Sequence, residues 1–241
     1  MLLSTFLKKR ANNFDKNIEF FEDKINSNHF CQKNGIKCPT IYTICNQASE
    51  LKHFKIPENC VIKYNNLSGS KGVVIRKNGI YNKGKNIKEV IKYLELNKKQ
   101  NPKCQKSIKN IKQKILVEEL LINSESDRPL VDIKLYCFKG EVKYIMLIDP
   151  NNRKEVFTYN TDLKRVKIDV RDADLHKNIE KPKYLEEIIK NGNYLAKKFF
   201  NNTFLRIDFY STTKGAIFGE FTFRPGNTFL PNSDKILGKL I

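Results

Sequence analysis

Apolar and polar residues alternate along residues 206–223 with the period of two that is typical of β-strands. In the first half of this stretch, the polar face carries Arg206, Asp208 and Tyr210. The turn residues centred on Lys214 predict a β-hairpin with a three-residue connection. That register places on the polar face of the returning strand Phe218, Glu220, Thr222 and Arg224.

The predicted register sets Asp208 opposite Glu220, and Arg206 opposite Thr222. Two carboxylates directly across a strand pair repel each other. We therefore expect a cation between them. Either a lysine or arginine side chain or a bound Mg²⁺, an ion that prefers oxygen ligands, would serve.

Hydrophobic periodicity also predicts the remaining elements of the chain. Helical spacing of apolar residues indicates helices in residues 1–34, 86–96 and 181–200, the last of which Pro182 opens. Short apolar or alternating runs predict strands at residues 40–45, 60–64, 73–79, 114–121, 130–138 and 142–149 and within 155–168. This order of elements predicts an α+β fold with mostly antiparallel strands.

The composition is that of a globular chain. Its 241 residues are enough to bury a core, and 40% of them are apolar. No apolar run approaches the roughly 18–20 residues that cross a bilayer, and the first residues do not follow the pattern of a secretory signal. We therefore expect a cytoplasmic protein.

Lys and Arg outnumber Asp and Glu by 45 to 26, which gives a net charge of +19. Such an excess favours polyanionic partners, among them nucleic acid and anionic membrane surfaces. The lysine-rich run at residues 97–114 is more typical of a solvated loop than of a dedicated binding patch. The cysteines and histidines form no CxxC, HxH or HxxxH group, which disfavours zinc binding and catalysis by histidine or cysteine.

A lysine, Lys63, lies in the apolar strand predicted at residues 60–64, where an ammonium group needs an anionic partner. The loop that follows consists of Ser68, Gly69, Ser70, Lys71 and Gly72. Its glycines allow the backbone to approach a ligand closely, and consecutive N–H groups in such loops bind phosphate oxygens. Taken alone, a Gly/Ser loop between two strands is more often a simple turn.

Two further patterns carry charges at strand ends. The run ILVEEL ends a predicted strand with Glu118 and Glu119, whose carboxylates are able to accept hydrogen bonds from a nucleoside. A strand that simply leaves the core has the same pattern. Lys134 and Arg153 are basic residues that are able to reach phosphates, although each alone is typical of an ordinary surface charge.

The order of these features resembles the ATP-grasp superfamily from about residue 26 to the end. The segments most similar to TupA-like ATP-grasp proteins of teichuronopeptide and cell-surface polysaccharide biosynthesis are GIKCPTIYTI, VIKYNNLSG, ILVEEL, DIKLYCFKGEVKYIMLID and FLRIDFYSTTKGAIFGEFTFRPG. The resemblance implies a short segment at residues 1–59, a small lobe at 60–121 and a large lobe at 122–241. The two α+β lobes would grip a nucleotide.

The resemblance also implies which residues contact the nucleotide. Lys63 would contact the α- and β-phosphates of ATP, and the loop at residues 68–72 would close over the β- and γ-phosphates. Glu118 and Leu120 would lie beside the adenine, and Glu119 would lie near the ribose.

The remaining implied roles belong to the large lobe. Mg²⁺ would be held by Asp208, Glu220 and Thr222, although the third position is commonly Asn in ATP-grasp enzymes. The transferred phosphoryl group would be steadied by Arg206, Lys134 and Arg153. Gly226, after Pro225, would offer its N–H to the substrate carboxylate.

These roles imply an ATP-dependent carboxylate–amine ligase that forms an acyl phosphate in the biosynthesis of a cell-surface polysaccharide or glycopeptide. Its partners would be ATP, a carboxylate and an amine, with weak association with anionic membranes and no specific nucleic acid. Two alternatives stay open. One is an ATP-grasp kinase that phosphorylates a sugar or polyol hydroxyl, and the other is a non-catalytic basic module that binds nucleic acid or an anionic membrane.

Overall fold

The structure is a computed structural model that describes all residues except 13–14, 99–109, 125–128, 150–151, 153–154 and 227. The chain divides into two compact units. Unit 1 comprises residues 1–14, 30–38 and 122–241, and unit 2 comprises residues 15–29 and 39–121. The residues of the segment 1–59 that the resemblance implies are divided between the two units.

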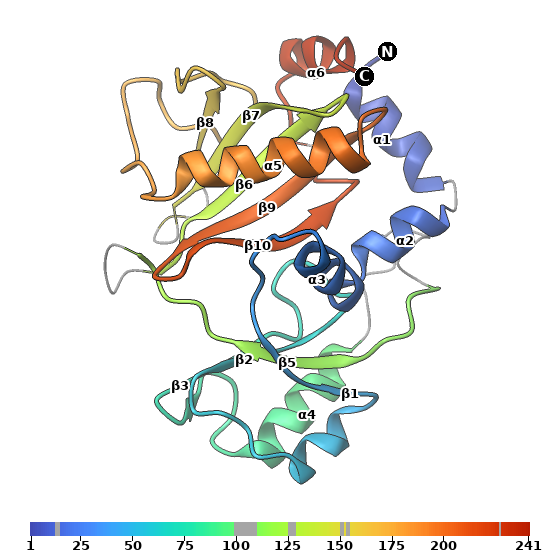
Figure 1. Cartoon of the computed structure of the whole chain (residues 1–241), viewed down its shortest axis with the longest axis vertical. Coiled ribbons are helices and arrows are strands. Elements are labelled where there is room, and N and C mark those ends of the chain that lie inside the picture. Colours follow the sequence, from blue (N-terminus) through green and yellow to red (C-terminus); the bar gives the residue numbers. More distant parts are fainter. Residues whose placement is uncertain (13–14, 99–109, 125–128, 150–151, 153–154, 227) are drawn as a thin grey trace. The chain divides into compact units, whose positions relative to one another are not determined.

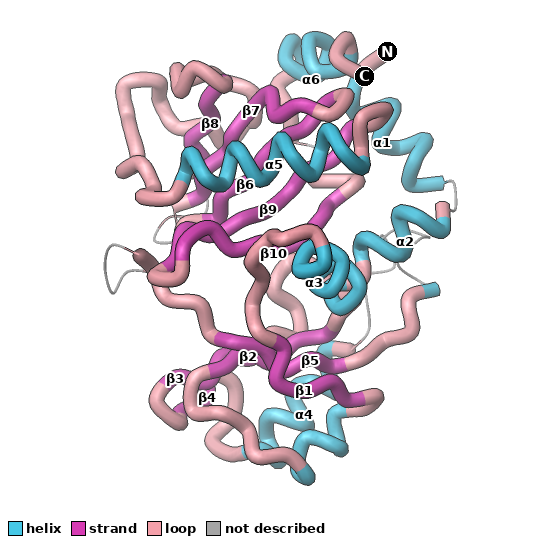
Figure 2. The backbone as a smooth tube through the Cα atoms, viewed as in Figure 1, coloured by secondary structure: helices cyan, strands magenta, loops and turns pink. Residues whose placement is uncertain are grey.

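Unit 2 is built on a five-stranded antiparallel sheet with the strand order β1-β5-β2-β3-β4, drawn in magenta in Figure 2. The strands are β1 (Ile41–Cys45), β5 (Ile115–Glu119), β2 (Cys60–Tyr64), β3 (Val74–Lys77) and β4 (Ile80–Tyr81). Helix α4 (Ile87–Asn97) and the 3₁₀ helix η1 (Ala48–His53) pack on one face, where Val90, Leu94 and Leu51 are fully buried. Helix α2 (Lys16–Glu22) and the first part of α3 (Lys24–Lys33) also belong to this unit.

Unit 1 is built on a second five-stranded antiparallel sheet with the order β10-β9-β6-β7-β8. Its strands are β10 (Gly215–Thr222), β9 (Phe204–Thr212), β6 (Asp132–Phe138), β7 (Glu141–Ile148) and β8 (Val156–Asn160). Helix α5 (Leu185–Phe199) lies across this sheet (Figure 1). The helix packs closely, because a Cβ on Gly192 would lie 2.2 Å from Leu135 Cδ1.

A second apolar cluster of unit 1 covers the other face of its sheet. Helix α1 (Leu3–Asn12) contributes Leu3 and Leu7, and helix α6 (Pro231–Gly238) contributes Leu237. These side chains pack with Tyr136 and Phe204 of the strands. Because strand side chains alternate between faces, Tyr136 lies on the face opposite Leu135 and α5.

The helices and strands predicted from periodicity are confirmed, and the fold is α+β with two antiparallel sheets. Sequence reasoning missed η1, β4 and α6, which are all short. Helix α5 begins at Leu185 after Tyr184, so Pro182 precedes the helix and does not open it. In the part of the chain that the structure describes, no helix combines the length and the apolar character needed to cross a membrane.

The turn of the β9–β10 hairpin differs from the predicted one. Gly215 pairs with Thr212, so the connection has two residues rather than three. Gly215 has a φ of +99°, a conformation that side-chain-bearing residues avoid. A β-bulge at Gly219 then adds one residue to β10 and restores the predicted pairing of Glu220 with Asp208.

The bulge corrects one face assignment. The sequence placed Phe218 on the polar face. Because the turn is one residue shorter than predicted and the bulge comes only after Phe218, this residue pairs with Phe209 and shares the apolar face. Its ring centroid lies 5.9 Å from that of Phe209 and 4.7 Å from that of Phe221.

Candidate functional site

One guanidinium group, that of Arg206, lies at the centre of a charged cluster on the sheet of unit 1. Its Nε donates to Asp208 Oδ1 at 2.6 Å, and its Nη2 donates to Asp208 Oδ2 at 2.7 Å. Nη2 also donates to Glu220 Oε1 at 3.5 Å and to Thr222 Oγ1 at 3.0 Å. A single arginine therefore contacts all three residues that the resemblance assigns to Mg²⁺.

Lys134 supplies a second cation from the neighbouring strand. Lys134 and Asp208 are partners across β6 and β9, and Lys134 Nζ lies 2.7 Å from Asp208 Oδ2. The side chain of Asp208 is 7% exposed, whereas that of Glu220 is 32% exposed. One carboxylate is thus enclosed by two cations, and the other borders solvent. The cation that the sequence required between the two acids is Arg206 in this structure.

The surroundings of Arg206 keep its guanidinium charged at neutral pH. Burial disfavours the charged guanidinium, but the Asp208 carboxylate outweighs that effect and raises the pKa of Arg206 above its ordinary value. Burial raises the pKa of Tyr136, the cross-strand partner of Arg206, to about 12. Tyr136 therefore stays neutral beside the cluster.

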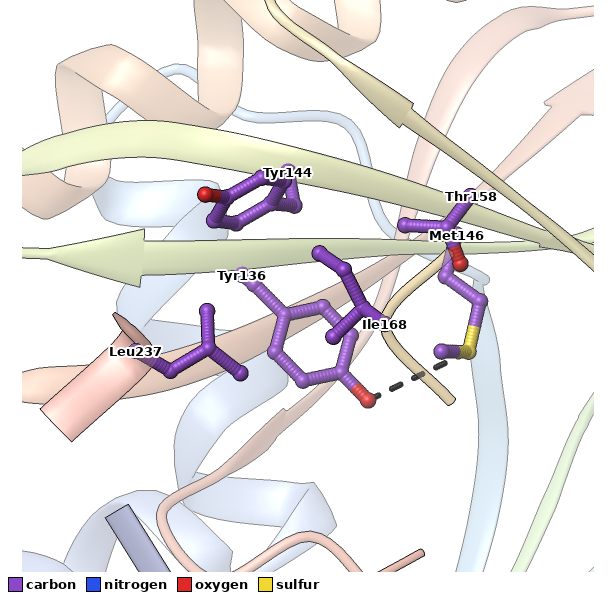
Figure 3. Close-up of a pocket in the computed structure, with 6 residues that line it drawn as sticks. All are labelled: Tyr136, Tyr144, Met146, Thr158, Ile168 and Leu237. Atoms are coloured by element: carbon purple, nitrogen blue, oxygen red, sulfur yellow. Dashed lines mark hydrogen bonds between the residues drawn. The ribbon is translucent and has the colours of Figure 1, made fainter. Parts of the chain in front are cut away.

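Next to the cluster lies an apolar pocket lined by Tyr136, Tyr144, Met146, Thr158, Ile168 and Leu237 (Figure 3). The Tyr136 hydroxyl donates to Met146 Sδ at 3.9 Å. The six side chains leave no room for a water molecule between them. We interpret this pocket as part of the core that supports the sheet, not as a ligand site.

In unit 2, Lys63 forms an ion pair with Glu118 on the adjacent strand β5. The two side chains are 18% and 9% exposed, so both are largely buried. The anionic partner that the sequence required for Lys63 is therefore Glu118. The resemblance assigns both residues to the nucleotide, and in this structure they neutralise each other.

The loop at residues 68–72 is exposed except at its last residue. The angle φ is +69° at Gly69, +61° at Ser70 and +62° at Gly72, and the left-handed conformation is uncommon for serine. A Cβ on Gly72 would lie 2.8 Å from the ring of Tyr64, so this position requires glycine.

Two asparagines that sequence reasoning missed hold the base of this loop. Asn65 is fully buried, and its Nδ2 donates to Asp23 Oδ2 at 3.0 Å and to the Lys112 carbonyl at 3.2 Å. Its Oδ1 accepts from the Lys114 N–H at 2.8 Å. The neighbouring Asn66 is also buried and bonds to the same segment before β5. The only sequence signal was a pair of amides directly after an apolar strand.

Glu119 and Leu120, at the end of β5, have surroundings that differ from those of Glu118. The N–H of Glu119 donates to the Thr40 carbonyl at 2.9 Å, and the Thr40 N–H donates to Glu119 Oε2 at 3.3 Å. Leu120 follows the strand and is half-buried. Glu119 thus binds the backbone just before β1 through both its main chain and its carboxylate.

A buried carboxylate, Asp169, anchors the loop that contains Pro225 and Gly226. Arg171 donates to both carboxylate oxygens of Asp169 at 2.8 Å, and Thr228 Oγ1 donates to Oδ2 at 2.5 Å. Gly226 is exposed, and a Cβ there would meet no atom of the described residues within 4 Å. Sequence reasoning missed Asp169 because its partner Thr228 is remote in the chain.

The cluster offers two carboxylates and one hydroxyl, which are oxygen donors of the kind that Mg²⁺ prefers. Within the described residues, no group of three or more His, Cys, Asp or Glu side chains is arranged to hold a metal. Oxygens of Asp208, Glu220 and Thr222 nevertheless converge on one point, Arg206 Nη2. Mg²⁺ is usually bound through one or two carboxylates together with substrate phosphates and water, so two carboxylates are enough.

The structure thus brings together two groups of the residues chosen from the sequence. The first group, in unit 1, consists of Arg206, Lys134, Asp208, Glu220 and Thr222. The second group, in unit 2, is the pair Lys63 and Glu118. Arg153 lies outside the described residues.

The chain is similar to a known protein family. A family model described as TupA-like ATPgrasp matches residues 4–241. A search of curated proteins gave no match.

Several solved structures have a similar fold. D-alanine–D-alanine ligase from Helicobacter pylori is 18% identical with a TM-score of 0.54, over 92% of this chain and 60% of the ligase. Phosphoribosylamine–glycine ligase from Thermotoga maritima is 18% identical with a TM-score of 0.53, over 95% of this chain and 54% of that one. L-amino acid ligase from Bacillus licheniformis is 15% identical with a TM-score of 0.51, over 87% and 44%. The chain therefore spans 60% or less of the length of these proteins, and at such identities the likeness establishes the fold alone.

Proposed function

The chain belongs to the TupA-like ATP-grasp family, and from this membership we propose that it is an ATP-dependent, Mg²⁺-requiring carboxylate–amine ligase. The similar solved structures are ligases whose fold it shares. The proposed substrates are ATP, a carboxylate and an amine. The resemblance to TupA-like proteins supports a substrate from cell-surface polysaccharide or glycopeptide biosynthesis.

The observation that carries this proposal is the convergence of two carboxylates, a hydroxyl and two cations on one face of the unit 1 sheet. Asp208, Glu220 and Thr222 would hold the metal, which when bound offsets negative charge on the phosphates of ATP. Arg206 and Lys134 would orient the γ-phosphoryl group and the acyl phosphate that forms from it.

The proposed reaction suits a site of this kind. A carboxylate is a poor acyl donor, and transfer of the γ-phosphoryl group onto it creates a good leaving group. The amine then attacks the acyl carbon, and the products are an amide, ADP and phosphate. Catalysis of such transfers consists mainly of positioning and charge stabilisation, which cations provide without a histidine base.

A thermal-shift assay with ATP and Mg²⁺ tests the nucleotide site. We expect wild-type protein to gain stability only when both are present, because the phosphates and the metal bind as one group. Asp208→Asn and Glu220→Gln should lose this gain. Glu141→Gln is the matched control, because it removes an exposed carboxylate from the same sheet and should retain the gain. A folded wild-type protein that shows no Mg·ATP binding by calorimetry would contradict the proposal.

A screen for ADP release tests the reaction itself. We expect ADP to form only when a carboxylate and an amine are both supplied, together with an amide product. A stable phosphorylated product that forms without any amine would instead support a kinase.

A further inference from the structure

We propose that Arg206 is an internal counter-ion that occupies the metal position of the cluster in the nucleotide-free protein and competes with the metal for it. The inference rests on the proposed function, because it concerns the same site. It adds an order of binding. The metal binds tightly only after the Arg206 guanidinium has moved away from the metal position. Nucleotide phosphates then accept the hydrogen bonds of that guanidinium.

The contacts of one nitrogen atom carry the argument. Arg206 Nη2 lies 2.7 Å from Asp208 Oδ2, 3.5 Å from Glu220 Oε1 and 3.0 Å from Thr222 Oγ1. These oxygens belong to the three residues proposed as metal ligands, so the nitrogen already lies where they converge. A metal bound to the same oxygens at about 2.0–2.1 Å would take this position.

The charges of the cluster explain why the two cations exclude each other. Arg206 and Lys134 balance Asp208 and Glu220, so the four side chains are neutral together. A divalent metal added beside a retained Arg206 would change the net charge of these four side chains from zero to +2, and repulsion between cations in a partly buried site is stronger than in water. Metal alone should therefore bind weakly.

The Arg206 guanidinium is also able to move away from the metal position in a single movement. Within the described part of the chain, each hydrogen bond of the Arg206 guanidinium goes to Asp208, Glu220 or Thr222. Among the described residues it donates to no backbone carbonyl that would fix it in place, unlike Arg165 in the same unit, which donates to the carbonyls of Thr158 and Ala173. When phosphate oxygens arrive, they are able to accept the same donors.

Lys134 provides a matched control for this competition. It carries the same charge and contacts the same atom, Asp208 Oδ2, but it forms no bond to Glu220 or Thr222 in the described structure. A general effect of removing positive charge should be equal at the two residues. Direct competition should be specific to Arg206.

The test measures Mn²⁺ binding without nucleotide, by calorimetry and by the electron paramagnetic resonance signal of free Mn²⁺. Arg206→Gln keeps a hydrogen-bond donor and removes the charge, and Lys134→Gln does the same at the control position. We expect Arg206→Gln to bind Mn²⁺ about tenfold or more tightly than wild type, because the metal then no longer displaces a charge-assisted contact of Arg206. Lys134→Gln should gain clearly less. Equal gains in both variants, or no gain in Arg206→Gln, would overturn the inference.

Thermal unfolding supplies a second readout. In EDTA, Arg206→Gln should melt below wild type, because Asp208 and Glu220 then face each other without their shared cation. Mn²⁺ should raise its melting temperature more than that of wild type. If Arg206→Gln does not fold with or without Mn²⁺, Arg206→Lys replaces it, since one ammonium group cannot span the oxygens that the fork reaches. Mn²⁺ binding by Arg206→Lys no tighter than by wild type then counts against the inference.

The outcomes separate this inference from the proposed function. Wild-type protein that binds Mg·ATP, combined with no Mn²⁺ gain in Arg206→Gln, removes only the inference. A Mn²⁺ gain that Asp208→Asn abolishes, in a protein that does not bind Mg·ATP, supports the inference and removes the proposed ligase.

Discussion

Lys63 lies in an apolar strand, and Glu118 on the neighbouring strand holds its ammonium group. The sequence predicted that Lys63 needs an acid, because an unpaired charge in such a strand is costly. It did not identify Glu118 as that acid, because the partner depends on strand register between segments that are more than 50 residues apart. For the same reason, the partners of Asn65 could not be predicted from its neighbours in the sequence.

The Lys63–Glu118 pair leads to a prediction that separates stability from nucleotide binding. Lys63→Met should lower the free energy of unfolding by about 3–5 kcal/mol, because Glu118 is left buried without its cation. Lys63→Met/Glu118→Leu should recover most of this loss, since an apolar pair of similar volume replaces a largely buried ion pair at little cost. Urea denaturation measures both values.

The double variant should nevertheless fail to gain stability from Mg·ATP in the thermal-shift assay. If it keeps the full nucleotide-dependent shift, Lys63 does not contact the phosphates.

The β9–β10 hairpin shows what periodicity predicts at the scale of an element. The pairing of Asp208 with Glu220 is confirmed, but it arises from a two-residue turn combined with a bulge at Gly219. The turn is one residue shorter than predicted, and the bulge adds one residue. The two differences cancel beyond Gly219, so the three-residue turn predicted from the sequence leads to the same pairing at the cluster. Phe218, which lies between the turn and the bulge, is where the two descriptions differ, and its face was predicted wrongly.

The anchored loop around Gly226 leads to a prediction about acid stability. Burial acts to raise the pKa of Asp169, but hydrogen bonds from Arg171 and Thr228 outweigh it and hold the pKa below the ordinary value of 3.8. A carboxyl group whose pKa is lower in the folded state stabilises the fold above its ordinary pKa. This contribution is lost as the pH falls below 3.8 and through the folded-state value.

Thr228→Val removes one of these hydrogen bonds, so the pKa of Asp169 should rise toward its ordinary value. Acid unfolding, followed by circular dichroism, should then begin at a higher pH than in wild type. Thr228→Ser keeps the hydroxyl and should unfold as wild type does. Equal acid midpoints for the Val and Ser variants would show that the Thr228 hydroxyl does not stabilise the carboxylate.

Across the whole molecule, the net charge of +19 does not come from the two charged sites. Lys63 and Glu118 cancel each other in unit 2, and the Arg206 cluster is neutral in unit 1. The excess positive charge therefore lies on other side chains, where it attracts polyanions without regard to the sites.

We expect wild-type protein to bind DNA or anionic vesicles at low salt with little sequence preference. The affinity should fall steeply, by about tenfold or more, between 50 and 200 mM salt, because binding releases counter-ions. Asp208→Asn should leave this binding unchanged. A polyanion affinity that depends on Asp208 would instead favour a dedicated nucleic-acid or membrane site.

The division of the N-terminal residues was hardest to predict from the sequence. Residues 30–38 belong to unit 1 although residues on both sides belong to unit 2. The Phe30 ring lies 4.8 Å from that of Phe199, and the N–H of Phe218 donates to the Lys37 carbonyl at 2.8 Å. These contacts join segments that are more than 160 residues apart, and no local pattern specifies them.

The bulge at Gly219 also has a consequence for variation among related chains. A two-residue turn with a bulge and a three-residue turn without one produce the same pairing further along the hairpin. The tip of the hairpin is thus able to gain a residue if the bulge loses one, and the carboxylates stay opposite each other. Insertions and deletions at this tip should therefore occur as compensating pairs.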